Sequence, residues 1–185
     1  MIILASCSPR RKELLSKIIS DFEIVASSID EDKLISYNYP AMETPQFLAT
    51  QKALDVFNKH PNDIVIAADT AIVFNNKIYG KPKDIKDAEN MLKAFSDNTH
   101  FVVTGVCIIS KKRNISFSSI NEVTFYNLSN EEINQYLSSN EYTDKAGSYA
   151  IQGKAALFIK NINGDYNSIV GLPIAEINRI LKKYF

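Results

Sequence analysis

Cysteine and histidine are scarce in this sequence. Only two cysteines, Cys7 and Cys107, occur among 185 residues. So few thiols in a chain of this length indicate reduced cysteines rather than a disulfide framework. The two histidines, His60 and His100, stand too far apart in the chain to suggest a zinc site. Cys-x-x-Cys, Walker and Gly-x-Ser-x-Gly motifs are also missing, so covalent nucleophilic catalysis has no support.

An excess of charge of either sign is missing as well. The 21 lysines and arginines balance 21 aspartates and glutamates, so no global field draws the protein toward nucleic acid or an anionic membrane. A basic surface studded with aromatic residues is not evident in the sequence, which disfavours sequence-independent nucleic-acid binding. Any anion site is therefore expected to be local.

Long apolar runs do not occur either. No stretch approaches the ~20 continuous apolar residues of a membrane-spanning helix. The apolar start Met1–Ala5 is interrupted at Ser6, too early for the core of a signal peptide. We therefore expect a soluble, cytoplasmic protein with no membrane partner.

The apolar residues that are present suffice for one buried core. They make up 45% of the chain, and its length fits one globular domain spanning residues 1–185. Runs of strand type alternate with helical patterns that open on capping signatures, which predicts a single α/β domain with a mixed β-sheet flanked by helices. The expected strands are Met1–Ser6, Phe22–Ala26, Asp63–Thr70, Ala71–Phe74 with Ile78–Tyr79, Phe101–Ser110, Ile115–Phe125 and Ala155–Ile162, and the expected helices begin at Ser8, Thr44, Asp84, Ser129 and Pro173.

The segment Ser8-Pro9-Arg10-Arg11 places two cations at the start of a helix. Cations there face the positive end of the helix dipole, so an anionic partner would compensate them. A serine hydroxyl, free backbone N–H groups and two guanidinium forks suit a polyphosphate. The alternative is an ordinary Ser-Pro cap followed by two solvated arginines.

Asp69 follows a run of buried strand type, where open α/β sheets place their ligands. We expect it at the carboxyl end of that strand. Asp30 and Glu31 add a second acidic cluster, and hard oxygen ligands suit magnesium or manganese carried in by a triphosphate. Standing alone, Asp69 would be interpreted as a turn residue and the acidic pair as a polar loop.

Two lysines and one loop complete the candidates. Lys52 lies on a predicted helix and Lys81 in a Gly-Lys-Pro turn, and each alone is more typical of a surface lysine than of a phosphate ligand. The loop 144–153 contains two glycines, which permit close backbone approach to a ligand, and the amide of Gln152. A structural turn is the alternative for this loop.

Six short motifs follow one another along the chain and together closely resemble the Maf family, over almost the whole length. The resemblance implies a nucleoside triphosphate pyrophosphatase with the two-lobed mixed α/β architecture of the inosine-triphosphatase-type house-cleaning enzymes. It also implies a historical link to septum formation and division arrest. The motifs are Ala5-Ser6-Cys7-Ser8-Pro9-Arg10-Arg11-x-Glu13-Leu14-Leu15, Ala68-Asp69-Thr70, Gly80-Lys81-Pro82, Thr99-His100 to Thr104-Gly105-Val106, Asp144-Lys145-Ala146-Gly147 to Ile151-Gln152-Gly153 and Val170-Gly171-Leu172-Pro173.

The resemblance also implies roles for individual residues. Asp69 would accept the proton of the attacking water, and Glu31 would help it to hold a divalent cation, Mg²⁺ or Mn²⁺. The phosphate contacts would be Ser8, Arg11, Lys52 and Lys81. Water would attack the α-phosphorus and release pyrophosphate without a covalent intermediate.

Three further residues bear on the base of the nucleotide. At Arg10, Thr70 and Gln152 the chain resembles the Maf branch that acts on dTTP and UTP. The sister branch that acts on 7-methyl-GTP tends to carry an aromatic residue, a glutamine and a glutamate there. A neutral amide offers a donor and an acceptor to the imide edge of thymine or uracil. We therefore expect hydrolysis of dTTP, UTP and modified pyrimidine nucleotides.

A nucleotide-binding regulator of division without turnover is the competing hypothesis. It predicts binding of a triphosphate without product. A homodimer is one assembly left open by the sequence. The chain departs from the family pattern at Cys7, where a small residue is common, and at Ser96-Asp97-Asn98, which replaces a Ser-Gly turn.

Overall fold

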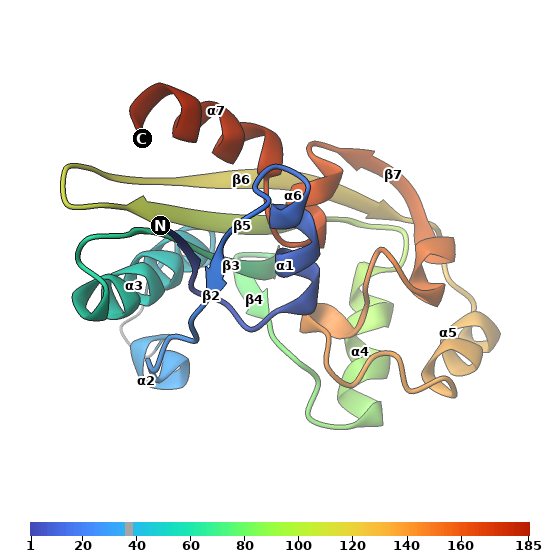
Figure 1. The fold of residues 1–185 in the computed structure, drawn as a ribbon. Helices are drawn as coiled ribbons and strands as arrows, with labels where there is room; N and C mark the ends of the chain where they lie inside the picture. The colour runs from blue at the N-terminus through green and yellow to red at the C-terminus, as the bar shows by residue number, and fades with distance from the viewer. Residues whose placement is uncertain (36–38) are drawn as a thin grey trace. The chain divides into compact units, whose positions relative to one another are not determined.

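A mixed β-sheet runs through the described part of the chain. The computed structural model describes residues 1–35 and 39–185. Seven strands of these residues form one sheet in the order β2-β1-β3-β5-β6-β7, with β4 paired to β3 (Figure 1). The mixed α/β class expected from the sequence is confirmed. The strands are β1 (Ile2–Leu4), β2 (Glu23–Ile24), β3 (Ile64–Phe74), β4 (Lys77–Tyr79), β5 (Thr99–Ile109), β6 (Asn114–Phe125) and β7 (Ile159–Asn163).

Seven α-helices and two 3₁₀-helices accompany these strands in the described residues. None of the helices is long and apolar enough to cross a membrane. The α-helices are α1 (Pro9–Ser16), α2 (Glu31–Ile35), α3 (Thr44–Lys59), α4 (Ile85–Phe95), α5 (Asn130–Leu137), α6 (Tyr166–Val170) and α7 (Ile174–Tyr184), and the 3₁₀-helices are η1 (Ala146–Ser148) and η2 (Lys154–Phe158).

The residues group into two compact units. Unit 1 comprises Met1–Thr70, Val103–Ser119 and Asn167–Phe185, and unit 2 comprises Ala71–Val102 and Ile120–Tyr166. Strands β3, β5 and β6 contribute residues to both units. The division agrees with the two lobes that the family resemblance implies.

The core of unit 1 lies where α3 packs on the parallel strands. Strand β1 pairs in parallel with β2 and with β3, so it is the inner strand of three. Ala49, Ala53 and Val56 of α3 are fully buried, and their spacing of four and three residues puts them on one helical face. They form one cluster with strand residues of β1, β3 and β5. Small side chains on α3 allow the helix to approach the sheet closely.

The core of unit 2 is aromatic. The ring of Phe95 on α4 packs against His100 with a centroid separation of 4.4 Å and edge-on against Phe125 at 6.0 Å. Tyr149 closes the cluster and shares a hydrogen bond of 2.6 Å with His100 Nε2. Burial lowers the pKa of His100 to about 3, so the imidazole is neutral at physiological pH.

Asp69 does not lie at the end of its strand, and that expectation is wrong. Strand β3 continues from Ile64 to Phe74 and includes the run that we expected to form a separate strand. Ala71, Ile72 and Val73 are buried, and β3 beyond Thr70 pairs with β4. A carboxylate in the middle of a strand does not end it when apolar residues on both sides are buried.

The expected strand at Ala155–Ile162 is also wrong in its first half. Residues 154–158 form η2, and strand β7 begins only at Ile159. Ala155 and Phe158 are buried whereas Leu157 is 83% exposed. A spacing of three residues between buried positions matches one turn of a 3₁₀-helix. By contrast, the capping box at Ser129 and Glu132 is confirmed.

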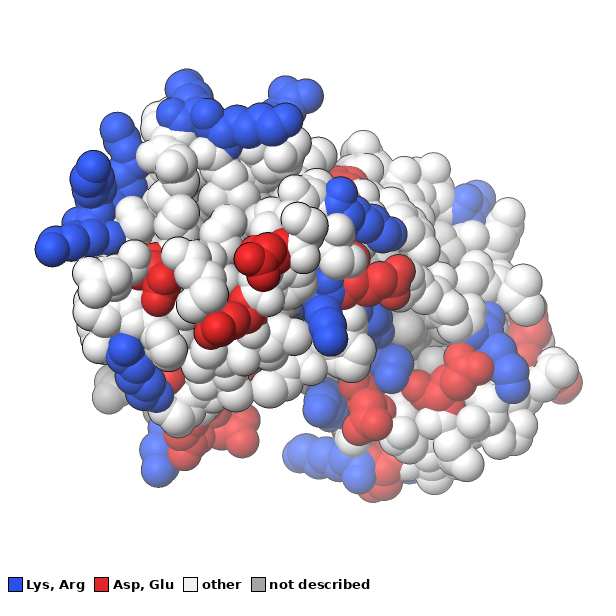
Figure 2. Space-filling model, in the orientation of Figure 1, with Lys and Arg blue, Asp and Glu red and all other residues white. Residues whose placement is uncertain are grey.

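Positive side chains gather on one part of unit 1. They extend from α7 to the turn between β5 and β6 (Figure 2). Arg113 and Lys183 lie 5.3 Å and 4.9 Å from the ring centroid of the exposed Tyr184. A local basic surface beside one exposed tyrosine therefore exists on unit 1 although the chain has zero net charge. The cations of this turn and of α7 are Lys111, Lys112, Arg113, Arg179, Lys182 and Lys183.

Gly105 fixes the distance between β5 and α3. A Cβ atom at this position would overlap backbone atoms of Pro45 and Gln46 in the first turn of α3. We predict that Gly105→Ala lowers the free energy of unfolding by about 3 kcal/mol, because backbone atoms cannot move aside as a flexible side chain can. Urea denaturation measures the change. Gly80→Ala is the matched control, since a Cβ there meets nothing within 4 Å, and equal losses in both variants would contradict the packing argument.

Candidate functional site

Seven of the nine residues expected at the site lie in unit 1, and two lie in unit 2. Those of unit 1 form two groups, one around the ammonium of Lys52 and one around the guanidinium of Arg11. The unit 1 residues are Ser8, Arg10, Arg11, Glu31, Lys52, Asp69 and Thr70, and the unit 2 residues are Lys81 and Gln152.

Two carboxylates converge on the buried ammonium of Lys52. Its Nζ lies 2.7 Å from Oδ1 of Asp69 and 2.9 Å from Oε1 of Glu31. Lys52 is only 8% exposed, and a buried cation is tolerated only where opposite charge surrounds it. Helix α3 supplies the lysine, the middle of β3 supplies Asp69, and the first residue of α2 supplies Glu31. The structure therefore brings together three residues to which the family resemblance assigns a metal and a phosphate contact, and it shows Lys52 paired with both carboxylates.

The same two carboxylates fit a divalent metal that arrives with a polyphosphate. Magnesium is commonly held by one or two protein carboxylates, with phosphate oxygens and water completing its shell. The described residues hold no group of three or more His, Cys, Asp or Glu side chains placed for a metal. Glu31 and Asp69 would thus be a partial donor set that needs oxygens from a ligand, and both carboxylates are bonded to Lys52.

The guanidinium of Arg11 is held by three acceptors within unit 1. Its Nε donates to the carbonyl of Gly171 at 3.0 Å, one terminal nitrogen to Oγ of Ser6 at 3.4 Å and the other to Oγ1 of Thr70 at 3.1 Å. Burial lowers the pKa of Arg11, and the charges of Asp69 and Glu31 oppose that shift. The arginine is therefore anchored, unlike the solvated side chain of the alternative interpretation.

Ser8 and Arg10 occupy the opening turn of α1. Ser8 is the N-cap, as expected, and its Oγ accepts the N–H of Arg11 at 3.5 Å. The N–H of Ser8 in turn donates to Oγ of Ser6 at 3.2 Å. Arg10 is exposed. Ser6 thus supports both the cap and the guanidinium of Arg11, a role that the sequence pattern did not reveal.

Lys81 and Gln152 belong to two segments of unit 2 that contact each other. The N–H of Gly147 donates to the carbonyl of Gly80 at 2.9 Å, which ties the Gly-Lys-Pro turn to the loop 144–153. Gly147 has φ +64°, and a Cβ there would contact Ile72 and Phe95. Both Lys81 and Gln152 are exposed. The conformation of the loop therefore depends on Gly147, which no other residue can replace without backbone strain.

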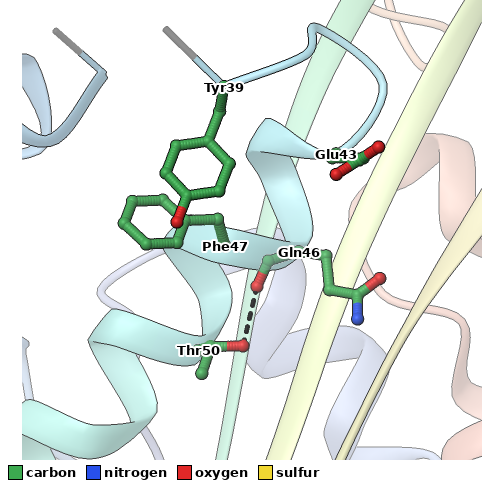
Figure 3. Close-up of a pocket in the computed structure, with 5 residues that line it drawn as sticks. All are labelled: Tyr39, Glu43, Gln46, Phe47 and Thr50. Atoms are coloured by element: carbon green, nitrogen blue, oxygen red, sulfur yellow. Dashed lines mark hydrogen bonds between the residues drawn. The ribbon is translucent and has the colours of Figure 1, made fainter. Parts of the chain in front are cut away.

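A separate pocket lies beside the first turns of α3. Its volume is about 320 Å³, and Figure 3 shows its five lining side chains, with Tyr39 stacked on Phe47 at a centroid separation of 4.0 Å. None of the nine expected residues lines it. It is lined by Tyr39, Glu43, Gln46, Phe47 and Thr50.

Asp55 is a residue that the sequence did not single out. It lies one turn after Lys52 on α3, and its Oδ2 accepts the N–H of Ser28 at 2.7 Å and the hydroxyl of Ser27 at 3.0 Å. Lys59 forms an ion pair with it at 3.0 Å. Asp55 therefore fastens to α3 the segment that leads to Glu31. Nothing but a carboxylate at helical spacing from Lys52 could have marked it in advance.

Comparisons with known proteins agree with the six motifs. The family profile described as Maf-like protein matches residues 1–184. A protein of Bacillus mycoides named dTTP/UTP pyrophosphatase is 48% identical over 183 residues, which cover 99% of this chain and 95% of the relative. A protein of the same name from Bacillus pumilus is also 48% identical, over 99% of this chain and 96% of the relative.

Among solved structures, the Ham1 protein of Staphylococcus aureus matches with a TM-score of 0.54 at 13% identity. The match covers 98% of this chain and 97% of the other. At that identity the likeness concerns the fold alone.

The Asp55 cluster makes stability depend on pH. The N–H of Ser28 above all, with further hydrogen bonds, lowers the pKa of Asp55 from 3.8 to about 2. A lowered carboxyl pKa stabilises the folded state above pH 4, and the contribution disappears as the pH falls through 2. We predict that Asp55→Ala loses about 1 to 2 kcal/mol at neutral pH and that its deficit shrinks toward pH 2.5 in urea titrations.

Asp32→Ala, which removes an exposed carboxylate outside this cluster, is the control for that measurement. A deficit of Asp55→Ala that stayed constant from pH 6 to pH 2.5 would contradict the account.

Proposed function

This chain belongs to the Maf family, and on that premise we propose that it hydrolyses dTTP and UTP to the nucleoside monophosphate and pyrophosphate. The observation that carries the proposal is the convergence of Glu31 and Asp69 on one buried ammonium. It is supported by relatives of that name, 48% identical over nearly the whole chain. A divalent metal, Mg²⁺ or Mn²⁺, is the cofactor that this donor set suits.

Asp69 is the proposed proton acceptor. Lys52 donates to its Oδ1 at 2.7 Å, and in this proposal the other oxygen accepts the proton of the attacking water. A positioned carboxylate orients that water and takes its proton as the bond to the α-phosphorus forms. When bound, a divalent metal would be held by Glu31 and Asp69 and would neutralise phosphate charge.

The cationic side chains would bind the triphosphate. A guanidinium has five N–H donors, and Gly171, Ser6 and Thr70 use three of those of Arg11. The two that remain, one on each terminal nitrogen, are the donors that Arg11 would offer to a phosphate group. Ser8, Lys52 and Lys81 are the further phosphate contacts in this proposal.

The base would be selected by Arg10, Thr70 and Gln152. The amide of Gln152 can donate to and accept from the imide edge of uracil or thymine. These two bases differ by one methyl group, which an apolar pocket distinguishes by only ~1–3 kcal/mol. We therefore expect similar use of dTTP and UTP and activity on modified pyrimidine nucleotides, in keeping with a house-cleaning enzyme.

The proposal extends to the localisation, the partners and the assembly of the protein. Residues 1–185 would act as one catalytic domain in the cytoplasm, without nucleic-acid or membrane partners, as a monomer or a homodimer. A link to septum formation and division arrest stays a prediction from the family resemblance.

Incubation of the purified protein with dTTP and Mg²⁺ or Mn²⁺ tests the reaction. We predict thymidine monophosphate and pyrophosphate, resolved by chromatography, with UTP used at a similar rate and 7-methyl-GTP used poorly. Diphosphate with orthophosphate, or intact dTTP, would refute the pyrophosphatase assignment. Faster use of 7-methyl-GTP or a purine triphosphate than of dTTP and UTP would refute only the assignment of the base.

Substitution of the two carboxylates separates their roles. We predict that Asp69→Asn lowers kcat by ~10²–10⁴-fold because the proton acceptor is lost, while Glu31 remains to pair with Lys52. Glu31→Gln should raise the metal concentration needed for half-maximal rate. Asp32→Asn, one residue along α2 and outside the cluster, is the control and should match the unmodified protein. Near-normal kcat in folded Asp69→Asn would exclude Asp69 as the base.

A further inference from the structure

Arg11 is held from two sides by one short segment of chain. The carbonyl of Gly171 accepts its Nε directly. On the other side Thr70 accepts from Arg11, Thr70 and Thr104 share a hydrogen bond of 2.9 Å, and Thr104 reaches the carbonyl of Ser168 at 2.8 Å. We propose that Thr104 is a positioning residue that fixes the guanidinium of Arg11 through Thr70. The inference rests on the proposed phosphate contact of Arg11.

The donor and the acceptor of each hydrogen bond in this series can be assigned. A backbone carbonyl can only accept, so Thr104 gives its single hydroxyl proton to Ser168. Thr104 must then accept from Thr70, which uses the one proton of Thr70. A guanidinium can only donate, so Thr70 accepts from Arg11. The donors thus run in one direction, from the cation to the carbonyl.

Burial raises the free-energy cost of losing any hydrogen bond in this series. Thr104 is completely buried, and donors aligned in one direction polarise one another in a medium of low dielectric constant. A buried hydroxyl that loses its partner costs more than the bond was worth. Removal of the Thr104 hydroxyl would leave Thr70 without an acceptor and free it to rotate. Arg11 would then lose one of its three acceptors and be held by Gly171 and Ser6 alone.

The same assignment of protons and lone pairs limits the hydrogen bonds that Thr70 can form with a substrate. Its proton is committed to Thr104, and one of its two lone pairs is committed to Arg11. Thr70 can therefore accept one more hydrogen bond but can donate none. Its influence on the choice of nucleotide acts through an accepted bond, its methyl group or the placement of Arg11.

Gly171 completes the ring of contacts. Its φ of +135° favours glycine, and the turn at Gly171 follows α6 directly, so its carbonyl and that of Ser168 come from positions three residues apart. The hydrogen bond from Arg11 and the hydrogen bond from Thr104 therefore both end on carbonyls of the segment 168–171. Four of the six sequence motifs contribute to it: those containing Arg11, Thr70, Thr104 and Gly171.

A double-mutant cycle tests the proposal. Thr104→Val keeps the shape and removes the hydroxyl, whereas Thr104→Ser keeps the hydroxyl. We expect Thr104→Val to lower kcat/KM for dTTP about tenfold, mainly through KM, and Thr104→Ser to restore most of that loss. In an Arg11→Ala background the effect of Thr104→Val should fall below about twofold, because the group it positions is gone. If Thr104→Val does not fold, Thr70→Val interrupts the same series of hydrogen bonds and its kcat/KM is measured instead.

Two results would overturn the inference: an undiminished effect of Thr104→Val in the Arg11→Ala background, or wild-type kcat/KM in Thr104→Val itself. NMR of the Arg11 guanidinium keeps the inference apart from the proposed function. Rotation about its Nε–Cζ bond should be slow in the wild type and in Thr104→Ser and measurably faster in Thr104→Val, whether or not dTTP is hydrolysed. Equal rotation rates in all three would refute the positioning role, and a wild type that forms no product would refute only the proposed function.

Discussion

A cation removed from water needs acceptors around it, and unit 1 meets this requirement twice. The ammonium of Lys52 has two carboxylates, and the guanidinium of Arg11 has a carbonyl and two hydroxyls. The second set contains no charged acceptor, so the charge of Arg11 is opposed only by Asp69 and Glu31 outside that set, whereas the first set carries one negative charge in excess. One group therefore suits a metal and the other an anion, and a metal-bound triphosphate has both kinds of charge.

Helix α3 links this chemistry to the core. Its small residues and the missing side chain at Gly105 set its distance from the sheet, and that distance places Lys52 beside Asp69. One turn further along, Asp55 fastens the segment that precedes Glu31. Stability and the geometry of the carboxylates are therefore not independent properties, since a change in the packing of α3 alters both.

The sequence predicted most of this where side-chain identity decides the outcome. The mixed sheet and the cap at Ser8 followed from patterns of residue type, whereas Glu31, Lys52 and Asp69 were named as site residues only through the family resemblance. What escaped prediction depends on partners that carry no signature in the sequence: the backbone carbonyls that hold Arg11 and Thr104, and a strand that continues past Asp69 because distant residues bury it. Hydrogen bonds to a backbone carbonyl look the same whichever side chain that residue carries.

Strand β5 places two adjacent residues with different tasks. Successive side chains on a strand face opposite sides of the sheet, so Thr104 can serve the Arg11 group while Gly105 admits α3. The insertion or deletion of one residue in β5 before this pair would turn Thr104 and Gly105 to the opposite faces of the sheet. The chain can vary in length at the β5–β6 turn, residues 110–113, but not within the strand, so differences in length among relatives should accumulate in that turn.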